Sequence, residues 1–106
     1  MSMEKEQLEY TSDVVEDDDA GVRTPRRFAV ILHNDNYTTM EFVVHVLVTV
    51  FHHPRERAAA LMQTVHEKGS ASAGEYTRDI AETRAAQAMA MARKEGFPLR
   101  CSLKEV

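Results

Sequence analysis

The chain has 106 residues, of which 43% are hydrophobic and 28% are charged, and its formal net charge is -4. This length and composition suit one small globular domain. The sequence contains no basic stripe typical of nucleic-acid binding, and its longest apolar run is too short to cross a bilayer. Cys101 is the only cysteine, which excludes an intrachain disulfide and favours a reducing compartment. We therefore expect a cytoplasmic protein that binds neither membranes nor nucleic acids.

The start of the chain differs in composition from the rest. Residues 1–20 contain one base, Lys5, and eight acids, which are Glu4, Glu6, Glu9, Asp13, Glu16, Asp17, Asp18 and Asp19. Few apolar side chains and strong self-repulsion predict a disordered acidic N-terminal arm over residues 1–26. Residues 27–106 then form the folded domain.

The first half of this domain predicts a strand and two helices. The apolar run Phe28–Leu32 is typical of a buried strand. Apolar residues from Met40 to Phe51 recur at helical spacing, and the pattern Thr38-x-x-Glu41 is a capping box that predicts the start of this helix. Pro54 suits the first position of a second helix, and Gly69 suits its end.

The second half predicts a weak strand or a connector, then a third helix and a final strand. Residues 70–76 are small and polar, and Thr77 can cap an alanine-rich helix that ends at Gly96 and Pro98. Residues 99–104 alternate between apolar and polar side chains, as in a strand with one face in water. The order strand, helix, helix, strand, helix, strand predicts an α+β fold, with three helices packed against a small sheet.

A polar stretch joins the first strand to the first helix and contains Asn34, Asp35, Asn36 and Thr38. These residue types are typical of a tight turn and a helix N-cap, which is the simpler interpretation. Three consecutive Asn or Asp residues exceed what one turn requires. The surplus oxygen atoms are hydrogen-bond acceptors that a binding site can use.

His66 is the most informative histidine, because it lies one helical turn after Met62 on the same helix face. It is either a partly buried histidine stabilised by the helix dipole or the polar end of an apolar pocket. His45, His52 and His53 have no cysteine or carboxylate at metal-ligand spacing. The sequence also lacks phosphate-loop, zinc-protease and serine-hydrolase motifs. We therefore predict neither a metal nor a cofactor.

Four stretches of the chain resemble the ClpS family: VILHNDNYTTMEFVVHVL, LMQTVHEKG, EYTRDIAETRAAQA and PLRCSLKEV. They contain N-D-x-Y-T-x-M-E-F, L-M-x-x-V-H, A-E-T and P-L-x-C in the family's order and spacing, and the resemblance extends over residues 27–106. ClpS proteins are bacterial adaptors that deliver N-end-rule substrates to the ClpA-type AAA+ unfoldase and its ClpP protease. The resemblance implies a three-stranded antiparallel sheet with three helices on one face, and a binding module that is not an enzyme.

The resemblance also implies a role for individual residues. The family pocket takes the first residue of a protein when that residue is Leu, Phe, Tyr or Trp. The free α-amino group would contact Asn34, Asn36 and His66, while Asp35 and Thr38 would serve the loop and the peptide backbone. The apolar wall would consist of Met40, Val43, Met62, Val65 and Leu99. The surface that contacts the N-domain of the unfoldase would include Asp79 and Arg84. The acidic arm would engage the unfoldase during delivery, and the adaptor would be a monomer.

Two positions depart from the family pattern N-D-D-Y-T-P-M. Asn36 stands where the family has Asp, so one acceptor oxygen remains but the charge is lost. Thr39 stands where the family has Pro, which frees one backbone angle and should loosen the loop slightly. Two other interpretations stay open: an interaction domain on this fold that modulates the unfoldase without reading N-terminal residues, and a hydrolase that uses His66 and Asp35.

Overall fold

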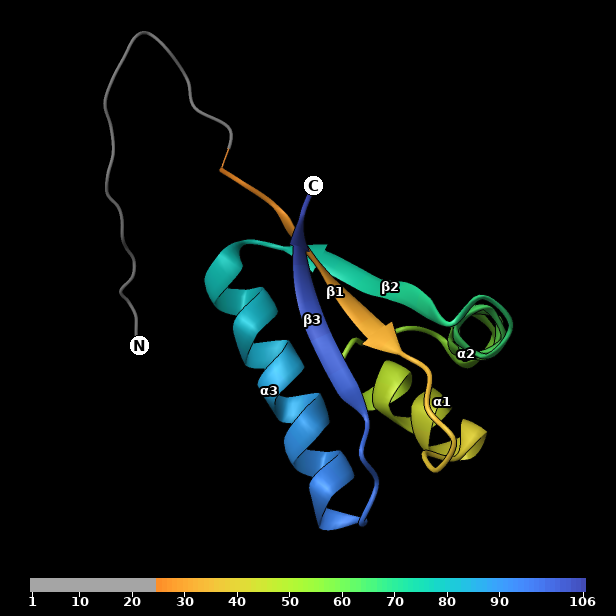
Figure 1. Ribbon diagram of the computed structural model, residues 1–106. Helices are drawn as coiled ribbons and strands as arrows, with labels where there is room; N and C mark the ends of the chain where they lie inside the picture. Colours follow the sequence, from red (N-terminus) through yellow and green to blue (C-terminus); the bar gives the residue numbers. More distant parts are fainter. Residues whose placement is uncertain (1–24) are drawn as a thin grey trace, which may run out of the picture.

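The computed structural model describes residues 25–106, and the elements follow the predicted order (Figure 1). They are β1 (Phe28–His33), α1 (Met40–Thr49), α2 (Arg55–Lys68), β2 (Ser70–Tyr76), α3 (Arg78–Lys94) and β3 (Arg100–Glu105). The strands form one sheet in the order β2-β1-β3. This architecture confirms the predicted α+β fold. Residues 1–24 of the predicted acidic arm lie outside the described residues.

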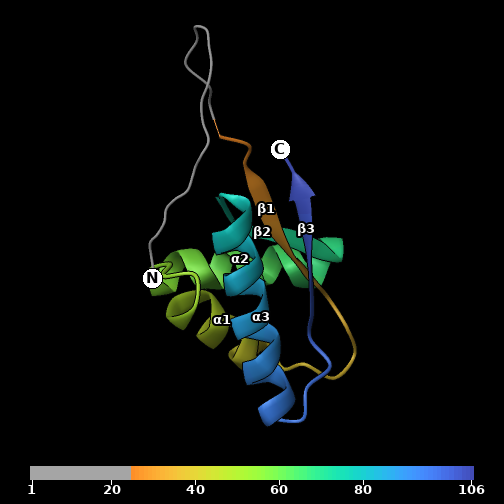
Figure 2. The ribbon, with the colours of Figure 1, turned by 90° about the vertical axis from the view of Figure 1, so that its left-hand side faces the viewer.

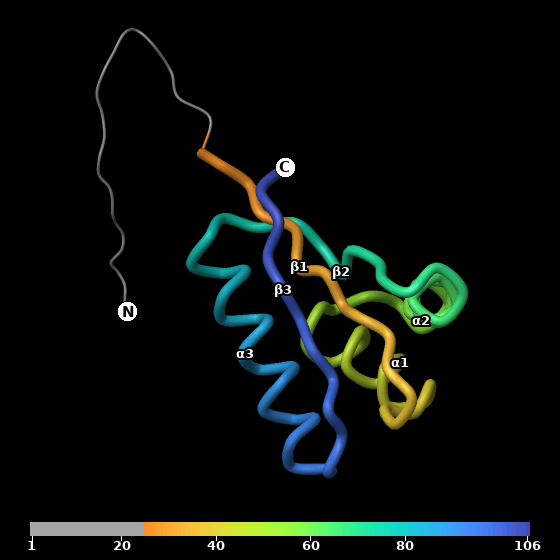
Figure 3. The backbone as a smooth tube through the Cα atoms, viewed as in Figure 1, coloured from red at the N-terminus to blue at the C-terminus, as the bar shows by residue number. Residues whose placement is uncertain are grey.

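The most apolar strand, β1, occupies the centre of the sheet and pairs antiparallel with both neighbours. Figure 3 shows β1 running between the two other strands, with the C-terminus beside the start of β1. There the Val106 N–H donates to the Arg27 carbonyl over 3.0 Å. The central position satisfies the backbone of β1 on both sides, which a strand buried among apolar side chains requires.

One β-bulge interrupts the pairing of β1 with β2. Val30 pairs with Gly74 but Ile31 pairs with Ser72, so Ala73 is the extra residue. The imidazole Nε2 of His53 lies at hydrogen-bond distance from the Ala73 carbonyl. Since a carbonyl only accepts, Nε2 carries the proton and donates. His53 therefore ties the connection between α1 and α2 to the bulge.

The helices cover one face of the sheet. Val30 and Leu32 point toward them and are fully buried, and α1 and α3 lie on the same side of β1 and β3 (Figure 2). α2 packs against α1 and β2. On the opposite face, His33 and Ser102 form a cross-strand hydrogen bond of 2.7 Å between Nε2 and Oγ. This difference between the faces explains the alternation along β3.

Alanine lets α3 lie close to the sheet. Ala81, Ala85, Ala88 and Ala92 are buried along one side of the helix. Because these side chains are small, the backbone of α3 can approach the sheet closely while the larger side chains of β1 and β3 fill the space between them.

The helix ends correct three details of the sequence prediction. α1 begins one residue later than the capping box implied: Thr39, not Thr38, is the N-cap, and its Oγ1 accepts a 3.1 Å hydrogen bond from the Phe42 N–H. Pro54 is the N-cap of α2 rather than its first helical residue. Thr77 precedes α3 as predicted but makes no side-chain capping bond. Gly69 ends α2 as predicted, with a left-handed φ of 91°.

We expect Ala88→Val to destabilise the fold more than Ala86→Val. Ala88 is fully buried against the sheet whereas Ala86 is exposed on the same helix. Overpacking at position 88 should cost about 1–3 kcal/mol, while valine at the exposed position costs only the difference in helix propensity, about 0.5 kcal/mol. Urea denaturation measures both values. Equal losses would contradict the close packing of α3.

Candidate binding pocket

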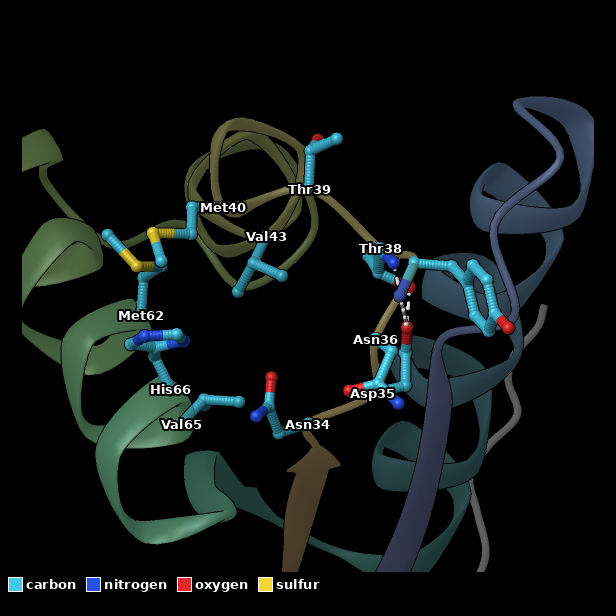
Figure 4. Close-up of a pocket in the computed structure, with 11 residues that line it drawn as sticks. Asn34, Asp35, Asn36, Thr38, Thr39, Met40, Val43, Met62, Val65 and His66 are labelled. Carbon is cyan, nitrogen blue, oxygen red and sulfur yellow. Dashed lines mark hydrogen bonds between the residues drawn. The ribbon is translucent and has the colours of Figure 1, made fainter.

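A pocket opens where the β1–α1 loop, the start of α1 and the end of α2 meet (Figure 4). Its volume is ≈ 410 Å³, within the range of about 300–1,000 Å³ usual for small-ligand sites. Eleven residues line it: Asn34, Asp35, Asn36, Tyr37, Thr38, Thr39, Met40, Val43, Met62, Val65 and His66. Two sequence-distant segments, 34–43 and 62–66, therefore meet in one cavity.

The carboxylate of Asp35 fixes the shape of the loop. Oδ1 accepts hydrogen bonds from the backbone N–H groups of Tyr37, over 2.8 Å, and Thr38, over 2.7 Å. Oδ2 accepts a third from the hydroxyl of Thr38, over 2.8 Å. Both oxygens are thus engaged with the loop itself (Figure 4). Asp35 and Thr38 organise the loop, in agreement with the turn interpretation of this stretch.

These bonds also set the ionisation of Asp35. Partial burial acts to raise the pKa of the carboxyl, but the hydrogen bonds from Thr38 and Tyr37 outweigh it, so the pKa is lowered below its usual value. The group is therefore a carboxylate at neutral pH, and its negative charge stays at the loop.

The polar end of the pocket lies between Asn34 and His66. The side chain of Asn34 points into the cavity, and the ring of His66 lies on the α2 side of it (Figure 4). The backbone N–H of Asn34 donates to the Gly69 carbonyl over 2.9 Å, which joins the end of β1 to the end of α2. This bond fixes the end of β1, which is followed by Asn34, against the end of α2, which carries His66. Asn36 is exposed on the loop beside them.

The rest of the pocket is apolar. Val43 and Val65 are buried, with 6% and 3% of their surface exposed, and form its floor with the hydrophobic core behind them. Met40 on α1 and Met62 on α2 also line the cavity, and their side chains lie toward one another between the two helices (Figure 4). The pocket therefore has hydrogen-bonding groups at one end and an apolar wall at the other.

Leu99 is the one predicted pocket residue that the structure places elsewhere. It is 5% exposed and belongs to the hydrophobic core, and it does not line the cavity. Tyr37 and Thr39 line the cavity although neither was predicted as a site residue. Both belong to the polar stretch between β1 and α1. Their position next to the predicted site residue Thr38 is the signal in the sequence that could have identified them.

The two residues predicted to face an unfoldase differ in their surroundings. Asp79 is exposed in the first turn of α3. Arg84 is half-buried, and its Nη1 donates to the Val50 carbonyl over 3.2 Å and lies 3.2 Å from His52 Nε2. Its guanidinium carbon also lies 5.9 Å from the centre of the Tyr76 ring. Arg84 therefore joins α3 to the end of α1.

Within residues 25–106, the groups that metal binding or nucleophilic attack would use have the following surroundings. This part of the chain holds no group of three or more His, Cys, Asp or Glu side chains able to bind a metal. Burial raises the pKa of the Cys101 thiol to about 11, which makes it a poor nucleophile. Within this described range the structure shows no hydrogen bond between Asp35 and His66, and the Asp35 oxygens already serve the loop.

No helix within residues 25–106 is long and apolar enough to span a membrane.

Comparisons with known proteins identify the family. The family model described as ATP-dependent Clp protease adaptor protein ClpS matches residues 23–102. An ATP-dependent Clp protease adapter protein ClpS from Nitratidesulfovibrio vulgaris is 55% identical over 97 residues, covering 92% of this chain and 91% of that protein. Its counterpart from Oleidesulfovibrio alaskensis is 55% identical over 85 residues, covering 80% and 82%. This chain belongs to the ClpS family of Clp protease adaptors, a family of adaptors rather than proteases.

A solved structure shares the fold. Agrobacterium tumefaciens ClpS2 bound to L-phenylalaninamide has a TM-score of 0.75 and 38% sequence identity to this chain. The match covers 78% of this chain and all of that one. The three antiparallel strands and three helices described above are therefore a ClpS fold.

We expect the pocket loop to lose its order in acid. Because the pKa of Asp35 is lowered in the folded state, its stabilisation is complete above the ordinary value of 3.8 and is lost as the pH falls through the folded value. Amide hydrogen exchange should show the protection of Tyr37 and Thr38 holding from neutral pH down to 3.8 and falling below it. Asp35→Ala should remove that protection at neutral pH, whereas Asp79→Ala should keep it. Unchanged protection in Asp35→Ala would contradict this role.

Proposed function

We propose that this adaptor binds the first residue of a substrate protein and delivers the substrate, as a cytoplasmic monomer, to a ClpA-type AAA+ unfoldase. The residue that it reads carries a free α-amino group and a large apolar side chain, namely Leu, Phe, Tyr or Trp. The observation that carries this proposal is the division of one cavity into an end with acceptors, at Asn34 and His66, and an apolar wall.

The polar end matches an α-ammonium group. An ammonium has only donors, so its site must present acceptors. The amide oxygens of Asn34 and Asn36 and a neutral imidazole nitrogen of His66 are acceptors of this kind. The ionised Asp35 adds a favourable negative charge nearby while its oxygens keep the loop in shape. In this role Asp35 and Thr38 present the backbone of the loop to the backbone of the peptide.

The apolar wall matches a large hydrophobic side chain. Burying Leu or Phe contributes roughly 1.5–3 kcal/mol, and each well-made hydrogen bond to a charged group adds about 1.5–3 kcal/mol. Together these contributions can reach the roughly -8 kcal/mol of a micromolar complex after the costs of association. Met40, Val43, Met62 and Val65 make this wall, and Leu99 supports it from the core.

The related ClpS2 of known structure supports the same chemistry, because L-phenylalaninamide combines a free amino group with a phenyl side chain. This chain is 38% identical to that protein. We propose that the pocket described here holds the corresponding group of an N-terminal Phe.

For delivery, we propose that the surface of α3 with Asp79 and Arg84 meets the N-domain of the unfoldase. Asp79 is exposed, so its charge is available to a partner. Arg84 is held by the Val50 carbonyl, so a partner would meet a guanidinium in a fixed position. The role of residues 1–26 in delivery also belongs to this proposal.

We expect isothermal titration to show that a peptide beginning with Leu or Phe binds while its N-acetylated twin does not. Acetylation removes the charge and two of the three N–H donors, which leaves acceptors at the polar end without a partner. His66→Ala should weaken binding of the free-amine peptide, with Gln63→Ala, an exposed α2 residue outside the pocket lining, as a control. Equal affinity for both peptides would refute recognition of the amino group. It would favour the second candidate, an interaction domain that binds the unfoldase without reading N-terminal residues.

We expect Asn36→Asp to strengthen peptide binding. An Asp restores a charge at a position where charge-assisted hydrogen bonds are about twice as strong as neutral ones. The gain should be ~1 kcal/mol, about fivefold in Kd. Titration of the same Leu peptide against both proteins measures it, and Gln87→Glu, which adds one negative charge at an exposed position of α3 outside the pocket lining, is a control for a general change in charge. An unchanged Kd would show that Asn36 does not contact the ligand.

A further inference from the structure

Methionine forms both helical sides of the apolar wall. Met40 is the first residue of α1, and Met62 on α2 lines the same cavity with its side chain directed toward Met40 (Figure 4). Met40 is 45% exposed at the pocket, whereas Met62, Met89 and Met91 are partly buried against the core. Among the methionines of residues 25–106, Met40 is therefore the one that a dissolved reagent meets most readily.

We propose that Met40 is a reversible oxidation site that closes the pocket to apolar N-terminal residues. This inference rests on the function proposed above. The reagent is a peroxide: its O–O bond breaks, the thioether sulfur of Met40 gains one oxygen atom as a sulfoxide, and water leaves when the peroxide is hydrogen peroxide. A sulfoxide reductase supplied with a dithiol reverses the change, releasing water and forming a disulfide in the reductant.

The change in polarity explains the effect on binding. A thioether is apolar and polarisable, so it packs well against aliphatic and aromatic side chains. A sulfoxide is polar and keeps water bound to its oxygen. A ligand side chain entering the cavity would have to strip this water away without offering a hydrogen bond in return. Oxidation should therefore weaken the binding of Leu and Phe termini.

The thiol of Cys101 does not compete with Met40 for the oxidant. Cys101, the single thiol of the chain, is buried in the hydrophobic core and remains protonated at neutral pH. Conversely, a bound N-terminal side chain covers the wall of the pocket and with it the sulfur of Met40. A loaded adaptor should then resist oxidation while an empty one is inactivated.

The test is oxidation of the full chain with hydrogen peroxide, followed by peptide mapping by mass spectrometry. Met40 should convert faster than Met89 and Met91. A saturating Leu-initiated peptide should slow the conversion of Met40 and leave the conversion of Met89 and Met91, which lie outside the pocket, unchanged. The oxidised protein should bind that peptide at least tenfold more weakly, and a mixture of both sulfoxide reductases with dithiothreitol should restore binding. Conversion of Met40 no faster than that of Met89, or unchanged affinity after oxidation, would overturn the proposal.

Two variants separate this site from the other methionines. Met91→Leu alters a methionine between α1 and α3, outside the pocket, so its binding should remain sensitive to peroxide. Met40→Leu should show the same Kd before and after treatment, whatever that Kd is. Loss of affinity in treated Met40→Leu equal to that of the unmodified chain would overturn the assignment to Met40. If the untreated protein binds no peptide, the proposed function fails, while the relative oxidation rates still decide whether Met40 is the reactive site.

Discussion

The pocket depends on how one carboxylate organises one loop. Asp35 accepts three hydrogen bonds from Tyr37 and Thr38 and thereby fixes the direction in which the chain leaves β1. Thr39 then caps α1, so the helix begins with Met40 at the mouth of the pocket. At the start of the loop, the Asn34 N–H donates to the Gly69 carbonyl. This bond holds the C-terminal end of α2, which carries His66, beside the loop. The loop is thus held at its start, middle and end.

The division of the cavity into two ends follows from this arrangement. The polar groups come from the loop and from the last turn of α2, where the chain leaves its regular elements. The apolar groups come from the sides of α1 and α2 that also face the core, and Val43 and Val65 belong to both the pocket and the core. An N-terminal residue is divided in the same way, since its charged amino group and its side chain are both bonded to the α-carbon. Recognition of the two together requires only that the two ends be held at a fixed separation.

Several elements were predictable because they depend on local physical chemistry. The apolar run of β1, the left-handed glycine at the end of α2 and the alanines of α3 act within a few residues of the chain, and the structure confirms them. The predicted cap at Thr38 was wrong for an equally local reason. Thr38 and Thr39 are both suitable caps, but the bond between Thr38 and Asp35 leaves Thr39 to cap the helix. Sequence spacing does not reveal which of two adjacent hydroxyls an upstream carboxylate will engage.

By itself, the sequence determined the order of elements, the polar stretch after β1 and, through family resemblance, the set of residues that meet at the pocket. Only the tertiary structure decided which of them line it. Leu99 alternates correctly for an inward-facing strand residue, but it is buried in the core, whereas Tyr37 and Thr39 line the cavity. Arg84 was predicted as a surface contact, yet it also binds the end of α1. These outcomes depend on the packing of segments far apart in the chain, and periodicity along one segment carries no information about the distance to another.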